Sequence, residues 1–360
     1  MIYDYLYNWT GSAPLAAFIQ SLLPLFIFIL PFALFAVLAE RKVSAHMQDR
    51  LGPMRVGYHG ILQTIADILK LIQKEDLTPA DSDKRLFNIA PALVFAGSYA
   101  VFAAIPFSGA FIGASIDLGL FYIVAVSGLV VVGILMAGWA SNNKYSILGA
   151  MRSAAQIISY EIPTMLVVLT IAMVTGTLNL YTLSEMQTGY FWNWLILGGP
   201  DFGISKFIFI PLMIISFVVI YISTLAEVNR TPFDIPEAES ELVSGYHTEY
   251  SGMKFAMFFL AEYANMFAVS AIVSAVFFGG YQSPFGYLGN TLGIPWLIPI
   301  EQFIWFTVKG LFFVFVQMWL RWTLPRLRVD QLMALCWKYL IPAALRRLAS
   351  AGSSARHLPE

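Results

Sequence analysis

Seven long apolar runs dominate this sequence, and they restrict the fold more than any other feature. A helix needs roughly 20 apolar residues to cross the hydrocarbon core of a bilayer, which is about 30 Å thick. Runs near that length occur at residues 15–39, 87–107, 118–140, 157–175, 206–226, 255–279 and 296–320. Only 12% of the residues are charged, about half the share found in a soluble domain. The sequence therefore predicts an all-α polytopic membrane protein.

An eighth apolar segment, residues 331–345, is shorter, contains Lys338 and leads into a basic C-terminal tail at residues 346–360. We expect it to form a weak eighth transmembrane helix, so that residues 1–345 make a single membrane domain. The alternative is seven spans followed by a helix in the interface. The first run, residues 15–39, is longer than the ~7–15-residue core of a signal peptide and should remain in the membrane.

Lys and Arg are unevenly distributed among the segments that connect the runs. The loops after the first, third, fifth and seventh runs hold 15 of these residues, whereas the N-terminal segment and the other three loops hold Lys206 alone. Cytoplasmic loops carry an excess of Lys and Arg. The distribution predicts an outer, periplasmic N-terminus and cytoplasmic odd-numbered loops. We expect a bacterial inner membrane as the location, and an organellar membrane stays open as the alternative.

The charge and cysteine content exclude several classes of function. The 21 Lys and Arg residues balance 22 Asp and Glu residues, so the chain lacks the basic field of a nucleic-acid-binding protein. Cys336 is the single cysteine, and an iron–sulfur cluster usually needs four. The four histidines are scattered without metal-ligand spacing. We therefore expect neither a metal ion nor a redox centre on this chain.

The first cytoplasmic loop, from Glu40 to Arg85, is long enough to have structure of its own. Apolar residues in it follow helical spacing: Ile61, Ile65, Ile68, Leu69 and Ile72. This pattern predicts an amphipathic helix in the membrane interface. Attraction of a basic helix to anionic lipid is the simpler explanation of its charges. Glu40, an acid at the end of the first apolar run, is less ordinary than the basic residues beside it.

Three ionisable residues fall within apolar runs: Glu161, Glu262 and Lys309. Such residues are costly in hydrocarbon and are functional candidates by default. Glu161 has a structural alternative, because an acid followed by Pro163 is also typical of the first turn of a helix. Lys309 lies in the middle of its run, where we expect its charge to be paired.

The fifth loop has the most unusual charge pattern. Within 23 residues, Arg230 is accompanied by six acidic residues: Glu227, Asp234, Glu237, Glu239, Glu241 and Glu249. Crowded carboxylates titrate as a coupled group and share protons, as a proton relay requires. An acidic surface that docks a soluble partner is the alternative, and the two roles are compatible.

Several long motifs follow one another in a fixed order. They are ERK from Glu40, GWASNNKY from Gly138, AQIISYE from Ala155, LAEVNRTPFDIPEAESELVSGYHTEY from Leu225, FLAEY from Phe259 and PRLRVDQLM from Pro325. With this set the chain resembles the family of the H subunit (subunit 1) of respiratory complex I, the proton-translocating NADH:quinone oxidoreductase. The family commonly has tyrosine where this chain has Val329, so any role of that hydroxyl is absent here.

The resemblance implies two sets of site residues. Those that match the lining of a chamber for quinone are Glu40, Arg41, Arg50, Ala66, Asp67, Arg230, Phe233 and Arg321. Those that match an acidic path from this chamber to the antiporter-like subunits are Glu161, Glu227, Glu237, Glu239, Glu241 and Glu262, with Tyr160 and Glu249 nearby. No residue of this chain is implied to be catalytic by itself.

The resemblance also implies a translocase subunit whose substrate is quinone. NADH, FMN and the iron–sulfur clusters would bind to partner subunits. The implied partners are the quinone-site and terminal iron–sulfur subunits of the peripheral arm, the small and antiporter-like membrane subunits, and membrane lipid. Three alternatives stay open: the equivalent subunit of a ferredoxin-dependent or hydrogenase-type relative, a structural anchor for a peripheral enzyme, and an autonomous proton or ion carrier that uses the intramembrane acids and Lys309.

Overall fold

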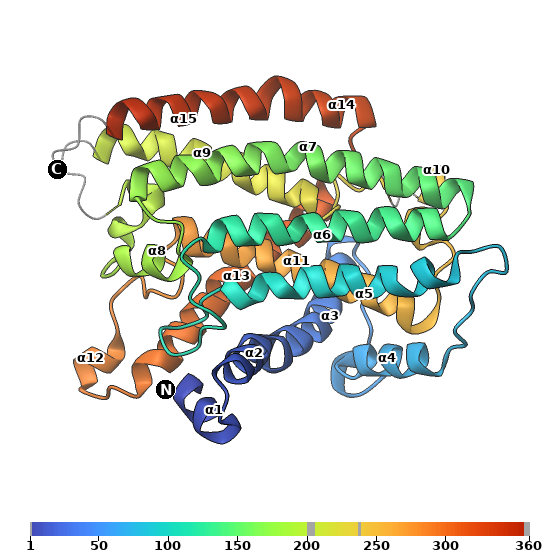
Figure 1. Cartoon of the computed structure of the whole chain (residues 1–360), viewed down its shortest axis with the longest axis horizontal. Helices are drawn as coiled ribbons and strands as arrows, with labels where there is room; N and C mark the ends of the chain where they lie inside the picture. The colour runs from blue at the N-terminus through green and yellow to red at the C-terminus, as the bar shows by residue number, and fades with distance from the viewer. Residues whose placement is uncertain (1, 200–205, 237–238, 356–360) are drawn as a thin grey trace.

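The computed structural model describes residues 2–199, 206–236 and 239–355. The fold is all-α (Figure 1). In chain order its α-helices are α1 (Ile2–Thr10), α2 (Ala13–Pro24), α3 (Leu30–Met47), α4 (Gln63–Gln73), α5 (Lys84–Ala100), α6 (Gly119–Ala140), α7 (Lys144–Thr175), α8 (Leu180–Met186), α9 (Lys206–Glu227), α10 (Glu239–Leu242), α11 (Gly252–Phe277), α12 (Leu288–Leu292), α13 (Leu297–Thr323), α14 (Val329–Ala334) and α15 (Ile341–Ala355).

Seven helical stretches in the described residues are long and apolar enough to cross a membrane. One joins α2 to α3 through a π-helical turn and covers Ala13–Met47; the others correspond to α5, α6, α7, α9, α11 and α13. They coincide with the seven apolar runs, so the prediction of an all-α polytopic membrane protein is confirmed. The amphipathic pattern of the first long loop corresponds to α4, which packs on α3 and α11.

Helix α7 is much longer than its apolar run. It begins at Lys144, where the side chain of Asn143 accepts a hydrogen bond from the backbone of Tyr145 at 2.9 Å. Glu161 and Pro163 therefore lie inside the helix, and the alternative that they start it is wrong. The first half of α7 is rich in small Ser, Ala and Gly residues that pack closely on α6 and on the turn at Gly245–His247. Their low hydropathy conceals the helix in the sequence.

The eighth segment is also longer than its apolar core. Helices α14 and α15, joined by a π-helical stretch, run beside α7 (Figure 1). Near the start, Leu332 accepts a hydrogen bond from Tyr160, and near the far end Gly352 lies beside Met173. The segment therefore follows α7 through its second half.

The helices converge in a way that positions the candidate site. Helices α3, α9 and α13 all terminate at one end of the bundle, where α11 begins; we call this the inner end and the opposite one the outer end. In Figure 1 the inner end is on the right, with α4 and α10, and α8 and α12 mark the outer end on the left. Helices α5, α6, α7 and α9 pack in sequence, and α11 packs against α5, α9 and α13.

Candidate functional site

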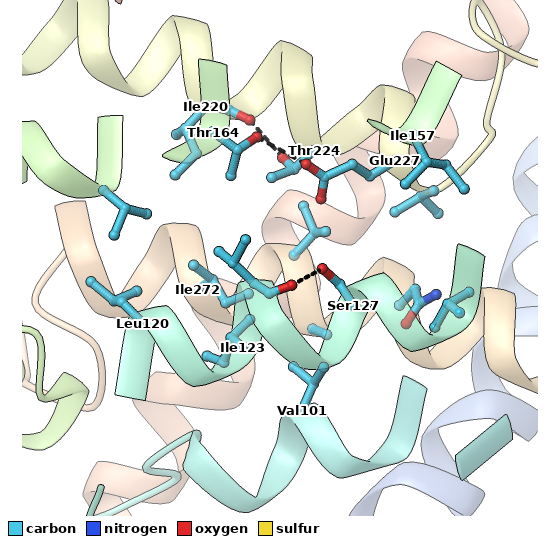
Figure 2. Close-up of a pocket in the computed structure, with 17 residues that line it drawn as sticks. Val101, Leu120, Ile123, Ser127, Ile157, Thr164, Ile220, Thr224, Glu227 and Ile272 are labelled. Atoms are coloured by element: carbon cyan, nitrogen blue, oxygen red, sulfur yellow. Dashed lines mark hydrogen bonds between the residues drawn. The ribbon is translucent and has the colours of Figure 1, made fainter. Parts of the chain in front are cut away.

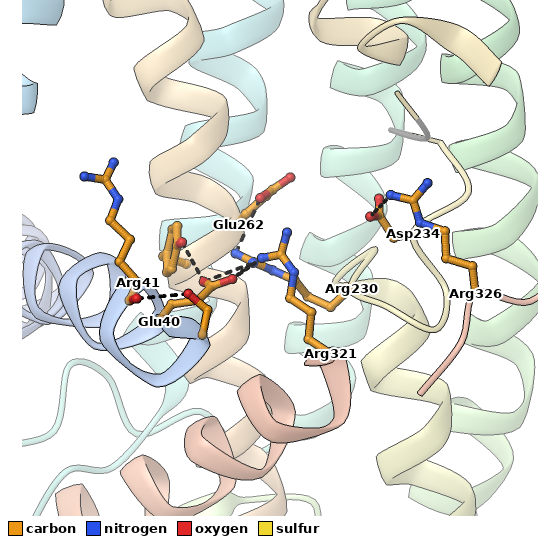
Figure 3. A network of polar contacts seen from close by, with 9 residues as sticks. Glu40, Arg41, Arg230, Asp234, Glu262, Arg321 and Arg326 are labelled. Carbon is orange, nitrogen blue, oxygen red and sulfur yellow. Dashed lines mark hydrogen bonds and ion pairs between the residues drawn. The ribbon is translucent and has the colours of Figure 1, made fainter. Parts of the chain in front are cut away.

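Charged side chains from four elements meet at the inner end of the bundle around Glu40 of α3 (Figure 3). Nη1 of Arg230 lies 3.0 and 3.1 Å from the two carboxylate oxygens of Glu40, and both side chains are buried. The hydroxyl of Tyr263, on α11, donates to the same carboxylate at 2.6 Å. Arg321, near the end of α13, also pairs with it. We call this group, together with Glu262, the Glu40 cluster.

The charges of the Glu40 cluster compensate one another. Oε2 of Glu262 lies 3.6 Å from Nη2 of Arg230, so two carboxylates face two guanidinium groups. Burial opposes the charge of Arg230, but the Glu40 carboxylate, with Tyr263 and Glu262, raises the pKa of Arg230 well above its ordinary value. Buried charges persist only when they are paired and hydrogen-bonded in this way. The cluster is thus a fixed array of charge at the inner end of a mainly apolar bundle.

A tight turn after α9 carries Arg230 into the cluster. Asn229 adopts a left-handed backbone conformation with φ of 54°, and the backbone of Phe233 donates to the carbonyl of Arg230 at 2.8 Å. Arg326 pairs with Asp234 at 3.0 Å, beside the cluster (Figure 3). Ion pairs with residues far away in the sequence therefore hold the turn at Arg230, by Glu40, and at Asp234, by Arg326.

A cavity of about 300 Å³ lies between α3, α4 and α11. Its walls are mostly apolar and include Val37 and Leu260, while Arg41, Asp67 and Lys70 supply charge. The side chains of Arg41 and Asp67 form an ion pair with an N–O distance of 2.5 Å. Figure 3 shows Arg41 pointing away from its neighbour Glu40. Phe259, in the cavity wall, contacts the ring of Tyr263 at a centroid distance of 5.2 Å, so cavity and cluster are adjacent.

A second, smaller cavity adjoins the end of α9. It has a volume of about 70 Å³ and is lined mainly by apolar residues, with Glu227, Thr164, Ser127 and Asn265 among the polar ones (Figure 2). The hydroxyl of Thr164 lies within hydrogen-bond distance of two acceptors, the Glu227 carboxylate at 2.9 Å and the carbonyl of Tyr160 at 3.0 Å. Glu161 lies one turn before Thr164 on the same helix. A space of this size with polar groups on its wall accommodates water.

The remaining predicted residues for the quinone chamber are dispersed. Phe233 packs edge-on against Tyr160 at a centroid distance of 5.6 Å. The Tyr160 hydroxyl donates to the carbonyl of Leu332 at 2.9 Å. Ala66 is half-buried on α4, and Arg50 is exposed beyond the end of α3. The structure therefore does not bring Arg50 to the Glu40 cluster.

The predicted acidic residues of the fifth loop are dispersed as well. Glu241 pairs with Arg152 of α7 at 2.8 Å, and Glu249 accepts from the side chain of Asn143 at 2.7 Å. Glu239 begins α10, and Glu237 lies outside the described residues. Within the described ranges, no three His, Cys, Asp or Glu side chains gather in a way that would hold a metal ion.

Lys309 lies far from the inner end, near the outer loop that follows α11. Its ammonium donates to the backbone carbonyls of Phe278, Gly280 and Gln282 at 2.7, 3.0 and 2.6 Å. It also lies 4.6 Å from the ring centroid of Trp194. The partners of this half-buried side chain are therefore carbonyl dipoles and an aromatic ring.

Comparison with known proteins decides the family. The sequence profile of the family described as NADH dehydrogenase matches residues 19–351. The chain belongs to the NADH dehydrogenase family. It is 54% identical to the H subunit of the NADH-quinone oxidoreductase of Chlorobaculum tepidum over 338 residues, which cover 93% of this chain and 91% of the relative. It is 47% identical to the H subunit of the Brevibacillus brevis enzyme, with 91% and 90% covered.

This member of the NADH dehydrogenase family has site residues that sequence reasoning missed. Tyr263 donates to the carboxylate of Glu40, and Thr164 donates to that of Glu227. Nε2 of His247 lies 4.0 Å from Oε1 of Glu262. Tyr263 directly follows Glu262 in sequence, and this adjacency was the available signal. Thr164 lies one turn from Glu161, but a threonine in an apolar helix usually bonds to its own backbone, as Thr164 also does to the carbonyl of Tyr160, so its bond to Glu227 could not be read from the sequence.

Proposed function

We propose that this protein is the membrane subunit of a proton-translocating NADH:quinone oxidoreductase. In this proposal it contributes the route by which quinone reaches its site. It also contributes part of the acidic path that couples quinone reduction to proton movement. The relatives, named as the H subunits of NADH-quinone oxidoreductases and matched over about nine tenths of both chains, support the enzyme class. The observation that carries the proposed route is the apolar cavity beside a buried charged cluster.

The chemistry of quinone accounts for the two parts of this route. A quinone has an apolar tail and a polar ring, so its path needs apolar walls and a few well-placed polar groups. The cavity between α3, α4 and α11 opens beside the amphipathic helix and has the Arg41–Asp67 pair on its wall. The Glu40 cluster lies directly behind it. In this proposal the tail occupies the cavity, and partner subunits bind most of the ring.

Reduction of quinone to quinol takes up two electrons and two protons. Electrons arrive from a redox centre on a partner subunit, and the negative charge they bring acts strongly on groups in a low-dielectric environment. In this proposal Arg230 and Arg321, both paired with Glu40, are the charged groups that respond to this negative charge. Glu227 comes three residues before Arg230 in the chain and bonds to Thr164. A change of charge at the cluster is then relayed to the carboxylates of Glu227 and Glu161.

The same proposal assigns the orientation and the partners. The inner end carries the basic loops and is assigned to the cytoplasm, with the N-terminus in the periplasm of a bacterial inner membrane. The eighth segment is assigned as a span because it runs beside α7 and ends near Met173. The inner end, with α10 and the acids near it, is assigned as the surface that meets the peripheral-arm subunits. Antiporter-like membrane subunits would receive the acidic path.

The test uses the native assembly. The chain is tagged and extracted in mild detergent, and inhibitor-sensitive quinone reduction is assayed with NADH and, in parallel, with reduced ferredoxin. The proposal predicts NADH-driven activity in an assembly much larger than the 40.1 kDa chain. Activity with ferredoxin alone would replace the proposal with the ferredoxin-dependent relative. A chain that migrates alone and moves ions in liposomes would contradict it.

A further inference from the structure

The turn that presents Arg230 is bound to α7 by one buried amide. Nε2 of Gln156 donates to the carbonyl of Ala226 at 2.8 Å, to Oδ1 of Asn229 at 3.1 Å and to the carbonyl of Phe233 at 2.8 Å. These acceptors lie before, within and after the turn. Gln156 is 2% exposed, so water does not compete for its donors.

A second side chain of α7 bonds to the same turn. The side-chain amide of Asn229 donates to the hydroxyl of Ser153 at 3.2 Å. Asn229 precedes Arg230 and has the left-handed conformation that begins the turn. Ser153 and Gln156 lie one helical turn apart on the same face of α7. The position of Arg230 relative to α7 is therefore set by two side chains of that helix.

The same face of α7 continues to the acidic residues. Tyr160 packs on Phe233, and Thr164 bonds to Glu227. Residues 153, 156, 160 and 164 follow the spacing of three or four that places side chains along one face of a helix. This stripe contacts the chain from Glu227 through the Arg230 turn to Phe233. It connects the Glu40 cluster with the Glu227 site through the backbone of the turn.

We propose that Gln156 is a positioning residue that holds the Arg230 turn against the face of α7 that also contacts Glu227. A change of charge in the proposed quinone route then affects Glu227 through this contact. The inference rests on the proposed function. Gln156 touches neither the Glu40 carboxylate nor the cavity wall in the described part of the chain; it acts through the backbone of the turn.

The chain offers a matched control at its outer end. Gln187 is also fully buried, and its Nε2 donates to the carbonyls of Leu183, Ala275 and Val276 at 3.0, 3.3 and 3.1 Å. Replacement of either glutamine by leucine leaves several buried acceptors without donors. Gln187→Leu also removes the acceptor of the backbone N–H groups of Leu195 and Gly279, at 2.9 and 3.0 Å, so it should lose at least as much thermal stability as Gln156→Leu. Only the replacement of Gln156 disturbs the Arg230 turn.

The experiment compares Gln156→Leu, Ser153→Ala and Gln187→Leu in the native assembly, with quinone KM, kcat, protons moved per quinone reduced and thermal midpoint as readouts. Gln156→Leu should raise the apparent KM about tenfold, as expected for roughly one lost buried hydrogen bond, and should lower the proton ratio. Ser153→Ala should also raise the apparent KM and lower the number of protons moved per quinone reduced, but by less. Gln187→Leu should change the thermal midpoint alone.

Three results would overturn the inference. The first is an unchanged quinone KM and an unchanged number of protons moved per quinone in assembled Gln156→Leu. The second is that both quantities are unchanged in Ser153→Ala. The third is that Gln187→Leu changes both quantities as much as Gln156→Leu does. If Gln156→Leu does not assemble, Ser153→Ala decides, because it removes a single hydrogen bond. Failure of the unmodified assembly to reduce quinone would instead contradict the proposed function, and the two failures are thereby distinguished.

Discussion

Glu40 and Arg230, 190 residues apart in sequence, form a buried ion pair in which one guanidinium nitrogen contacts both carboxylate oxygens. The pair joins the end of the first span to the turn after α9. It lies beside the cavity proposed for quinone and three residues from Glu227 in the chain. In the proposed mechanism this contact connects the proposed quinone route with the acidic residues.

Replacement of Arg230 by methionine should be strongly destabilising. Removal of one partner from a buried pair leaves an uncompensated charge, which costs about 3–5 kcal/mol. The expected result is a much lower thermal midpoint of the assembly or a loss of assembled complex. Because the pKa of Arg230 is raised, its pair with Glu40 should persist at every alkaline pH at which the assembly stays folded. An unchanged midpoint in Arg230→Met would contradict the description of the cluster.

Replacement of Arg321 by methionine should affect quinone more than stability. Arg321 is 31% exposed, and Glu40 keeps its bonds to Arg230 and Tyr263 without it. We expect a several-fold higher apparent quinone KM in steady-state assays, with normal assembly. The control is Arg328→Met, which removes an exposed arginine of the segment that follows α13. Equal KM values for the two variants would remove Arg321 from the route.

Replacement of Thr164 by valine should weaken coupling. The variant keeps the shape of the side chain but removes the donor to Glu227, and a buried acceptor left without its partner costs about 1–3 kcal/mol. We expect fewer protons moved per quinone reduced in liposomes. Thr170→Val is the control, because the Thr170 hydroxyl bonds to the carbonyl of Leu166 in its own helix. Full proton movement in Thr164→Val would argue against a role for this bond.

Replacement of Lys309 by methionine should lower stability without altering coupling. The change removes the donor from three backbone carbonyls at the outer end. The thermal midpoint should fall, whereas the quinone KM and the proton ratio of the surviving assembly should match the unmodified protein. Loss of proton movement at normal stability would favour the ion-carrier alternative, in which Lys309 lies on the ion path.

The sequence predicted the spans well and the detailed site only in part. Apolar runs report burial in lipid directly, and seven of them became helices. The start of α7 was hidden because its small residues pack against other helices and not against lipid. Glu40 and Arg230 were both predicted from motifs, but their pairing depends on tertiary structure. The partners of Lys309 are backbone carbonyls, which no residue type in the sequence reveals.

The most direct test of the account is the Glu227→Gln variant of the tagged native assembly, reconstituted in liposomes. NADH-driven quinone reduction and proton movement are measured together, with NADH oxidation by an artificial acceptor as the control for the peripheral arm. We predict that quinone reduction and proton movement both fall while the artificial acceptor is still reduced. Undiminished proton movement with normal quinone reduction would contradict the proposal that Glu227 couples the two.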